Sequence, residues 1–155
     1  MKKKWLKVLF FLFILFLYFL PSFIFKADID YYNTLKGPHL FPWLFVVIWS
    51  IIYITMSVYV TSIVFSNHSI NTAEYTRIYV FLGINYLLQA TFLPVFFYLH
   101  NLFIAFALCI FTFVTILIIC LETLLVNKKL TLLTLPYVLW SAFASVFSIL
   151  FYLQN

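Results

Sequence analysis

Charged residues are scarce in this sequence. They make up 8% of its 155 residues, whereas 66% of the residues are hydrophobic. A soluble domain of this composition would have too little polar surface to cover its own apolar mass. The shortage of charge therefore excludes a soluble globular protein and indicates an integral membrane protein.

Side chains suited to ion or phosphate chemistry are also rare. Glu122 is the only acidic residue within a predicted span, and it lies near a span end, where it can reach water. Proton relays and ion pathways usually need carboxylates or histidines deep in a bundle. The sequence has no Gly-rich phosphate loop, no His/Cys metal spacing and no nucleophile elbow. We therefore predict no metal site and no obligatory cofactor, and ion-coupled transport is not favoured.

Only two cysteines are present, and both lie in one predicted span. Cys109 and Cys120 are eleven residues apart. On an α-helix this spacing places them on nearly the same face but about 16 Å apart, which is too far for a disulfide. We expect two ordinary buried thiols.

Long apolar segments dominate the rest of the chain. Each is long enough for a helix of about 20 residues to cross a hydrocarbon core of about 30 Å. The predicted spans cover residues 5–25, 43–65, 77–99, 102–126 and 130–153. Almost nothing remains outside them. The sequence therefore predicts an all-α integral membrane protein, in which residues 1–155 form a single bundle of five transmembrane helices.

The basic residues predict an orientation, because lysine and arginine near span ends tend to remain in the cytoplasm. Four lysines within the first seven residues, Arg77, and the pair Lys128 and Lys129 all fall on one side of the predicted bundle. We expect a plasma-membrane protein with a cytoplasmic N-terminus and an external C-terminus. Two lysines of the first loop are exceptions, and two aspartates accompany them. The net charge of +5 is thus a topology signal, and no nucleic-acid partner is predicted.

Aromatic side chains make up 23% of the sequence, and many recur at helical spacing on three predicted spans. These faces comprise Phe45, Trp49 and Tyr53 of the second span, Asn85, Gln89, Phe92 and Phe96 of the third, and Tyr137, Trp140, Phe143, Ala144 and Phe147 of the fifth. Amides in hydrocarbon need hydrogen-bond partners. The predicted span 77–99 must therefore direct the face that carries Asn85 and Gln89 toward protein or a wet cavity.

Two interpretations of these aromatic faces stay open. Together they could line a pocket for a large, flat, amphipathic ligand, whose rings would stack on indoles and phenols. Alternatively they are helix-packing faces, since Ser141 and Ser145, like Ala144 and Ser148, form small-xxx-small pairs that bring backbones together. Spacing alone favours packing.

The order of the motifs resembles the translocator protein family, whose members are also called tryptophan-rich sensory proteins (TspO). The segment Pro136–Ala144 matches the family's most specific signature, P-Y-x-x-W-x-x-F-A. The segment Trp43–Tyr53 is similar to its W-x-F-x-x-V-W-x-x-x-Y run, and Tyr31–Pro38 to its first-loop element. The resemblance covers nearly the whole chain in order.

The third span departs from the family pattern. Where the family commonly has Q-x-x-x-N-x-x-W, this chain has Asn85, Gln89 and Phe92. The two amides are exchanged, and phenylalanine replaces the tryptophan. The longer Gln89 side chain would narrow a pocket built for asparagine, so we expect a shifted ligand preference.

The resemblance implies a pocket within the bundle that binds a porphyrin, such as protoporphyrin IX or haem, beneath the loop between the first two spans. It also implies homodimers in the lipid bilayer and a role as sensor or regulator of porphyrin levels. In some bacterial members the pocket tryptophans take part in light-dependent porphyrin degradation, and Trp49 and Trp140 carry over to that role. The expected ligand-binding residues are Phe45, Trp49, Tyr53, Asn85, Gln89, Phe92, Tyr137, Trp140 and Ala144.

Enzymatic turnover is ranked below binding, because the sequence offers no evident acid, base or metal ligand. Besides porphyrin binding and porphyrin turnover, a third hypothesis is that the protein transports small molecules or lipids, or is a membrane partner protein, without a catalytic role.

Overall fold

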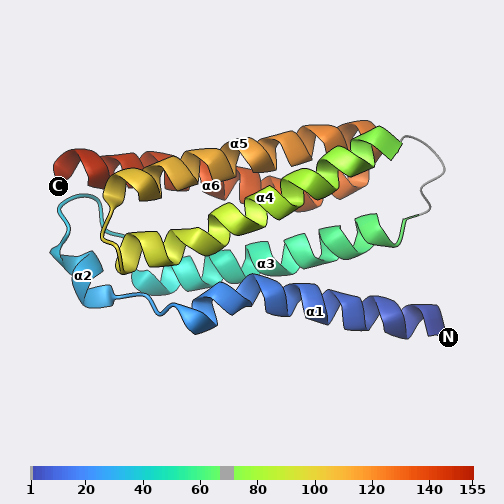
Figure 1. Cartoon of the computed structure of the whole chain (residues 1–155), viewed down its shortest axis with the longest axis horizontal. Coiled ribbons are helices and arrows are strands. Elements are labelled where there is room, and N and C mark those ends of the chain that lie inside the picture. Colours follow the sequence, from blue (N-terminus) through green and yellow to red (C-terminus); the bar gives the residue numbers. More distant parts are fainter. Residues whose placement is uncertain (1, 67–71) are drawn as a thin grey trace.

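The computed structural model describes residues 2–66 and 72–155. Five long helices make up most of this part of the chain: α1 (Lys2–Ile24), α3 (Pro42–Val64), α4 (Thr72–Phe97), α5 (Leu102–Val126) and α6 (Lys128–Gln154). A short helix, α2 (Ile29–Thr34), lies between α1 and α3 (Figure 1). The described residues contain no strand, and each long helix is long and apolar enough to cross a membrane. The predicted all-α bundle of five spans is confirmed.

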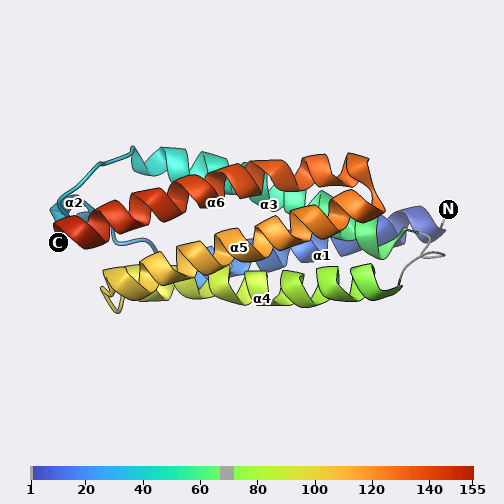
Figure 2. The same cartoon turned by 90° about the horizontal axis from the view of Figure 1, so that it is seen from above.

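Two asparagines determine where the last two spans begin. The side chain of Asn101 accepts a hydrogen bond from Ile104 N at 2.9 Å, which caps α5. Asn127 alone separates α5 from α6, and its Oδ1 accepts from Lys129 N at 3.0 Å and Leu130 N at 3.3 Å. These bonds satisfy backbone donors that the first helical turn leaves free. The one-residue junction forces α6 to run back along α5 (Figure 2).

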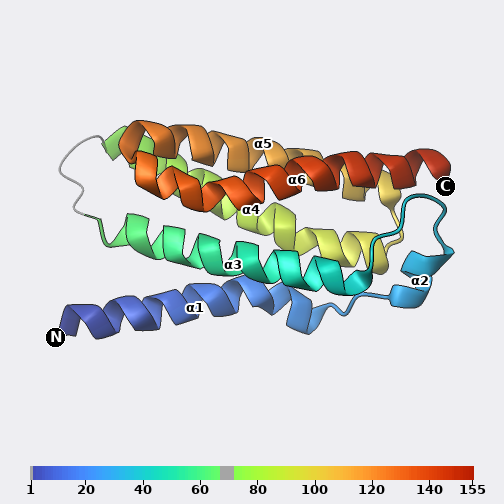
Figure 3. The same cartoon turned by 180° about the vertical axis from the view of Figure 1, so that it is seen from behind.

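The packing of the five spans is uneven. Helix α5 packs against both α4 and α6, and α6 also contacts α3. Helix α1 lies at the edge of the bundle, where it packs mainly against α3 (Figure 3). The C-terminal part of α1 forms one wall of a space between the helices, through residues such as Phe19 and Phe23.

The two ends of the bundle differ in charge. The N-terminus, the start of α4 and the α5–α6 junction lie at one end, and α2 and the C-terminus lie at the other (Figure 1). The first end carries Lys4, Lys7, Arg77, Lys128 and Lys129. This separation agrees with the charge pattern from which the orientation was predicted, and the assignment of the first end to the cytoplasm stays a prediction.

An ion pair joins α4 to α5 at the first end. Arg77 Nε and Nη2 donate to the two carboxylate oxygens of Glu122 at 2.8 and 2.9 Å, and Glu74 lies 3.5 Å from the same guanidinium. This two-point geometry is the strong form of an arginine–carboxylate contact. The carboxylate that lies within the fourth predicted span is therefore neutralised by a partner on the neighbouring helix.

A buried amide joins the same two helices near the middle of α4. Asn85 Nδ2 donates to Thr112 O at 3.1 Å and to Thr115 Oγ1 at 2.8 Å. The side chain of Asn85 is almost completely buried. This amide thus faces protein, which is one of the two environments that the sequence allowed.

Replacing Asn85 with alanine removes both interhelical bonds. We expect the free energy of unfolding to fall by about 1 kcal/mol, because hydrogen bonds between membrane helices contribute roughly this much. Thermal unfolding of the purified protein in detergent measures the change. Ser62→Ala is the matched control, since the Ser62 hydroxyl donates to Val58 O of its own helix. Equal unfolding midpoints for the two variants would show that Asn85 does not hold α4 to α5.

Candidate ligand-binding cavity

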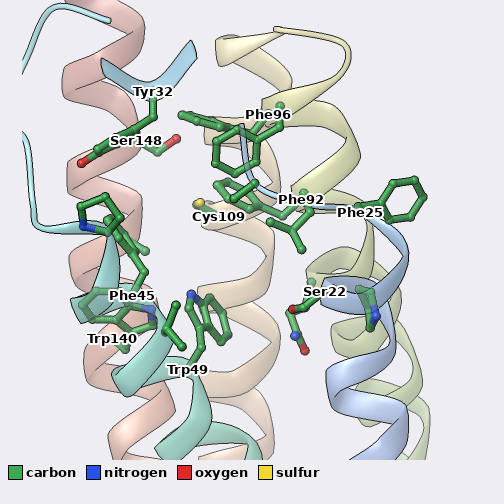
Figure 4. Close-up of a pocket in the computed structure, with 18 of the residues that line it drawn as sticks. Ser22, Phe25, Tyr32, Phe45, Trp49, Phe92, Phe96, Cys109, Trp140 and Ser148 are labelled. Carbon is green, nitrogen blue, oxygen red and sulfur yellow. The ribbon is translucent and has the colours of Figure 1, made fainter. Parts of the chain in front are cut away.

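A cavity of about 610 Å³ lies between the helices toward the end that carries α2. Its lining is mainly apolar and aromatic, and all six helices contribute to it. A volume of this size lies within the range of about 300–1,000 Å³ that small-molecule sites occupy. Figure 4 shows side chains from α3 and α6 directed toward the same space.

Seven of the nine predicted ligand-binding residues line this cavity. They are Phe45, Trp49, Tyr53, Gln89, Phe92, Trp140 and Ala144. The other two, Asn85 and Tyr137, are buried but are not among the lining residues. The amide of Asn85 is held by α5, and the Tyr137 ring packs edge-on against Trp49 at a centroid distance of 5.8 Å.

Two tryptophans from different helices form one wall of the cavity. Trp49 of α3 lies next to Tyr53, with ring centroids 5.5 Å apart. Trp140 of α6 meets the edge of Phe45 at 5.8 Å, so the aromatic faces of α3 and α6 are in contact (Figure 4). The aromatic faces therefore serve both in helix packing and in lining a cavity, the two interpretations that the sequence left open.

Three lining residues carry polar atoms that are not satisfied by strong hydrogen bonds. Gln89 Oε1 and Trp140 Nε1 have no partner among the described residues, and Ser148 Oγ has the weakly polar thiol of Cys109 beside it. All three side chains are at least nine-tenths buried. Buried polar groups are nearly always paired, and an unpaired one costs about 1–3 kcal/mol. A ligand with matching donors and acceptors would remove this cost.

Helix α2 lines the cavity through Ile29 and Tyr32 at the end of the bundle where α2 lies. Tyr32 of α2 is buried, and its hydroxyl accepts from Leu40 N at 2.9 Å. Burial raises the pKa of this phenol. The side chain of Asn155 accepts from Lys36 N at 2.9 Å and donates to Lys36 O at 2.8 Å. The last residue of the chain thus holds the loop against the bundle.

The model of the TspO/MBR family matches residues 9–153 of this sequence. The chain belongs to the TspO/MBR family. The tryptophan-rich protein TspO of Bacillus cereus is 29% identical over 143 residues, which cover 90% of each chain. The uncharacterized membrane protein YtaB of Bacillus subtilis is 30% identical over 129 residues, which cover 82% of this chain and 81% of the relative. The resemblance read from the motifs is confirmed, and the protein is a multi-pass membrane protein of this family.

In this TspO/MBR protein, some lining residues carry no signal in the sequence. Ser22 and Lys26 come from the end of α1 and the connection after it, where no motif singled them out. Cys109 was expected to be an ordinary buried thiol, yet it lines the cavity, whereas Cys120 does not. Helical spacing places both cysteines on one face of α5. They differ in their position along the helix, and only Cys109 lies at the level of the cavity.

Replacing Asn155 with alanine removes both bonds to Lys36. We expect the Lys36 amide hydrogen to exchange with solvent about fivefold to tenfold faster, because each lost hydrogen bond contributes roughly 1 kcal/mol. Hydrogen exchange followed by mass spectrometry of residues 35–41 measures the change. Asn33→Ala, a substitution at an exposed position of α2, is the control. Unchanged exchange in Asn155→Ala would contradict a fastening role for this residue.

Proposed function

We propose that this TspO/MBR protein binds a tetrapyrrole of the porphyrin class in the cavity and acts as a sensor or regulator of porphyrin levels in the membrane. The observation that carries the proposal is that Trp49 and Trp140, from two different spans, line the same hollow. Indoles stack well on flat aromatic ring systems. A cavity walled by two indoles and several phenylalanines suits a large planar ligand better than a lipid chain or a small ion.

The polar groups of the cavity support a ligand with polar substituents. The Trp140 indole N–H can donate to an acceptor on the ligand, and Gln89 Oε1 can accept from a donor. Gln89 is held in place because its Nε2 donates to the Tyr53 hydroxyl at 2.7 Å. Its free oxygen is therefore a fixed acceptor, and ligands that lack a donor would leave it unpaired.

The charge of the lining supports an anionic ligand. Lys26 lies in the exposed connection between α1 and α2, and the described lining residues include no carboxylate. Porphyrins carry carboxylate side chains on one edge of an apolar ring. A porphyrin with its ring against the indoles and its carboxylates toward Lys26 would match the apolar interior and the basic rim together.

Removing both indoles tests the proposal. In the double variant Trp49→Phe, Trp140→Phe we expect protoporphyrin IX to bind about tenfold more weakly, because phenylalanine offers a smaller ring at both positions and no donor in place of the Trp140 N–H, whose hydrogen bond would contribute roughly 0.5–1.5 kcal/mol. The absorbance shift of the porphyrin in titrations of the purified protein measures the dissociation constant of each variant. Trp5→Phe is the control, since Trp5 is exposed and does not line the cavity. Equal affinity in the double variant and the wild type would exclude this site.

Lys26→Gln tests the orientation. We expect about threefold weaker binding of protoporphyrin IX, because a partly exposed ion pair contributes less than about 1 kcal/mol. The same titration with the dimethyl ester of protoporphyrin, which has no carboxylate, should not respond to Lys26→Gln. Lys36→Gln is the matched control, since Lys36 is a basic residue of the same loop region outside the lining. Equal losses in both lysine variants would indicate a general charge effect instead.

The position of the indoles also supports a second proposed activity, the light-dependent degradation of bound porphyrin. Both tryptophans line the cavity, so an excited ligand would lie against side chains that oxidise readily. Illumination of the complex, with loss of the porphyrin absorbance compared between the wild type and the double tryptophan variant, separates conversion from binding. Equal rates at equal occupancy would remove Trp49 and Trp140 from this role.

A further inference from the structure

We propose that the Cys109 thiol is an axial ligand for iron, so that the cavity takes a ferric haem as well as a metal-free porphyrin. This inference rests on the proposed function, because it assigns a second binding contact within the same cavity. It concerns a residue that neither the family motifs nor the sequence pattern singles out.

Cys109 lies where a ligand could reach it. It comes from α5, lines the cavity and is a free cysteine. Figure 4 shows its sulfur directed into the space between the phenylalanines of α4 and the side chains of α6. Cys120 is also buried and free, but it does not line the cavity. The two thiols therefore differ in access to a ligand and not in burial.

The other side chains of the lining leave Cys109 as the available iron ligand. Haem iron in proteins is held by histidine, cysteine, methionine or tyrosine. The described residues of the lining include no histidine and no methionine. The Tyr32 hydroxyl is bonded to the backbone of Leu40, and the Tyr53 hydroxyl accepts from Gln89. A sulfur with no strong partner is thus the free donor atom in the cavity.

Other polar groups of the lining could also contact a bound molecule. Ser148 lies beside Cys109 and lines the same space, and its hydroxyl can donate to a thiolate sulfur. Trp140 and Gln89, both nine-tenths buried, belong to the same lining, and Trp140 Nε1 and Gln89 Oε1 have no partner within residues 2–66 and 72–155. Buried groups of this kind are expected to be completed by a ligand that also has polar atoms.

Charge balance explains how a thiolate can exist in this apolar place. An isolated buried thiolate would be costly, but a coordinating metal ion deprotonates a thiol outright. The porphyrin core of a ferric haem carries one positive charge, so the iron–thiolate pair is neutral. When the haem arrives as its hydroxide complex, the Fe–S bond forms, the hydroxide takes the thiol proton, and both leave as water. The iron stays ferric and no electron is transferred.

Spectroscopy of the full-length protein in lipid nanodiscs tests the inference. Ferric haem is titrated into the wild type, Cys109→Ser and Cys120→Ser, and the optical and electron paramagnetic resonance spectra are recorded. We expect a ferric thiolate signature in the wild type and in Cys120→Ser, and its loss in Cys109→Ser. We also expect about tenfold weaker haem binding in Cys109→Ser, and a smaller loss for metal-free protoporphyrin IX, which has no iron for the sulfur to bind.

Each other outcome has a defined meaning. Identical spectra and affinities for the wild type and Cys109→Ser would overturn the iron ligand while leaving porphyrin binding in place. Loss of the signature in Cys120→Ser but not in Cys109→Ser would overturn it as well. If the wild type binds neither ferric haem nor protoporphyrin IX, the proposed function itself fails, and the axial ligand fails with it.

Discussion

The surrounding hydrocarbon makes every polar group in a span depend on a partner within the protein, since no water is present to satisfy it. This constraint explains the helical fold, because only an α-helix pairs the backbone groups of a single span. It also explains where the polar side chains go. The Ser57 hydroxyl donates to Tyr53 O of its own helix at 2.6 Å, and Asn85 and Arg77 reach partners on α5.

Among the described residues, six buried side chains keep a polar atom without a hydrogen-bond partner, and three of them, Gln89, Trp140 and Ser148, line the cavity. Gln89 and Trp140 are buried as deeply as many fully paired residues, yet each has an atom with no hydrogen-bond partner in the part of the chain that the structure describes. The other three, Thr61, Glu74 and Tyr137, lie outside the lining, so unpaired groups are not confined to the cavity. The contrast between Asn85 and Gln89 is informative, because they lie one turn apart on α4. One amide holds the bundle together, and the other is directed toward the hollow.

The arrangement of the helices creates the hollow. The pairs α4–α5 and α5–α6 pack tightly, whereas α1 leans mainly on α3 at the edge. The bulky residues of α1, α3 and α4 then meet the small residues Ser141, Ala144 and Ser148 of α6 across an incompletely filled space.

The sequence by itself determined the membrane location, the five spans and the family. These follow from composition, from apolar runs of membrane length and from the order of the aromatic motifs. It also identified the part of the cavity wall that α3 contributes, because helical spacing places Phe45, Trp49 and Tyr53 on one face whatever the neighbours are. Only the tertiary structure decided which face meets which. It directed Asn85 to α5 instead of the cavity, and it separated Cys109 from Cys120. Spacing describes one helix at a time, whereas a cavity depends on the rotation, tilt and depth of several helices packed together.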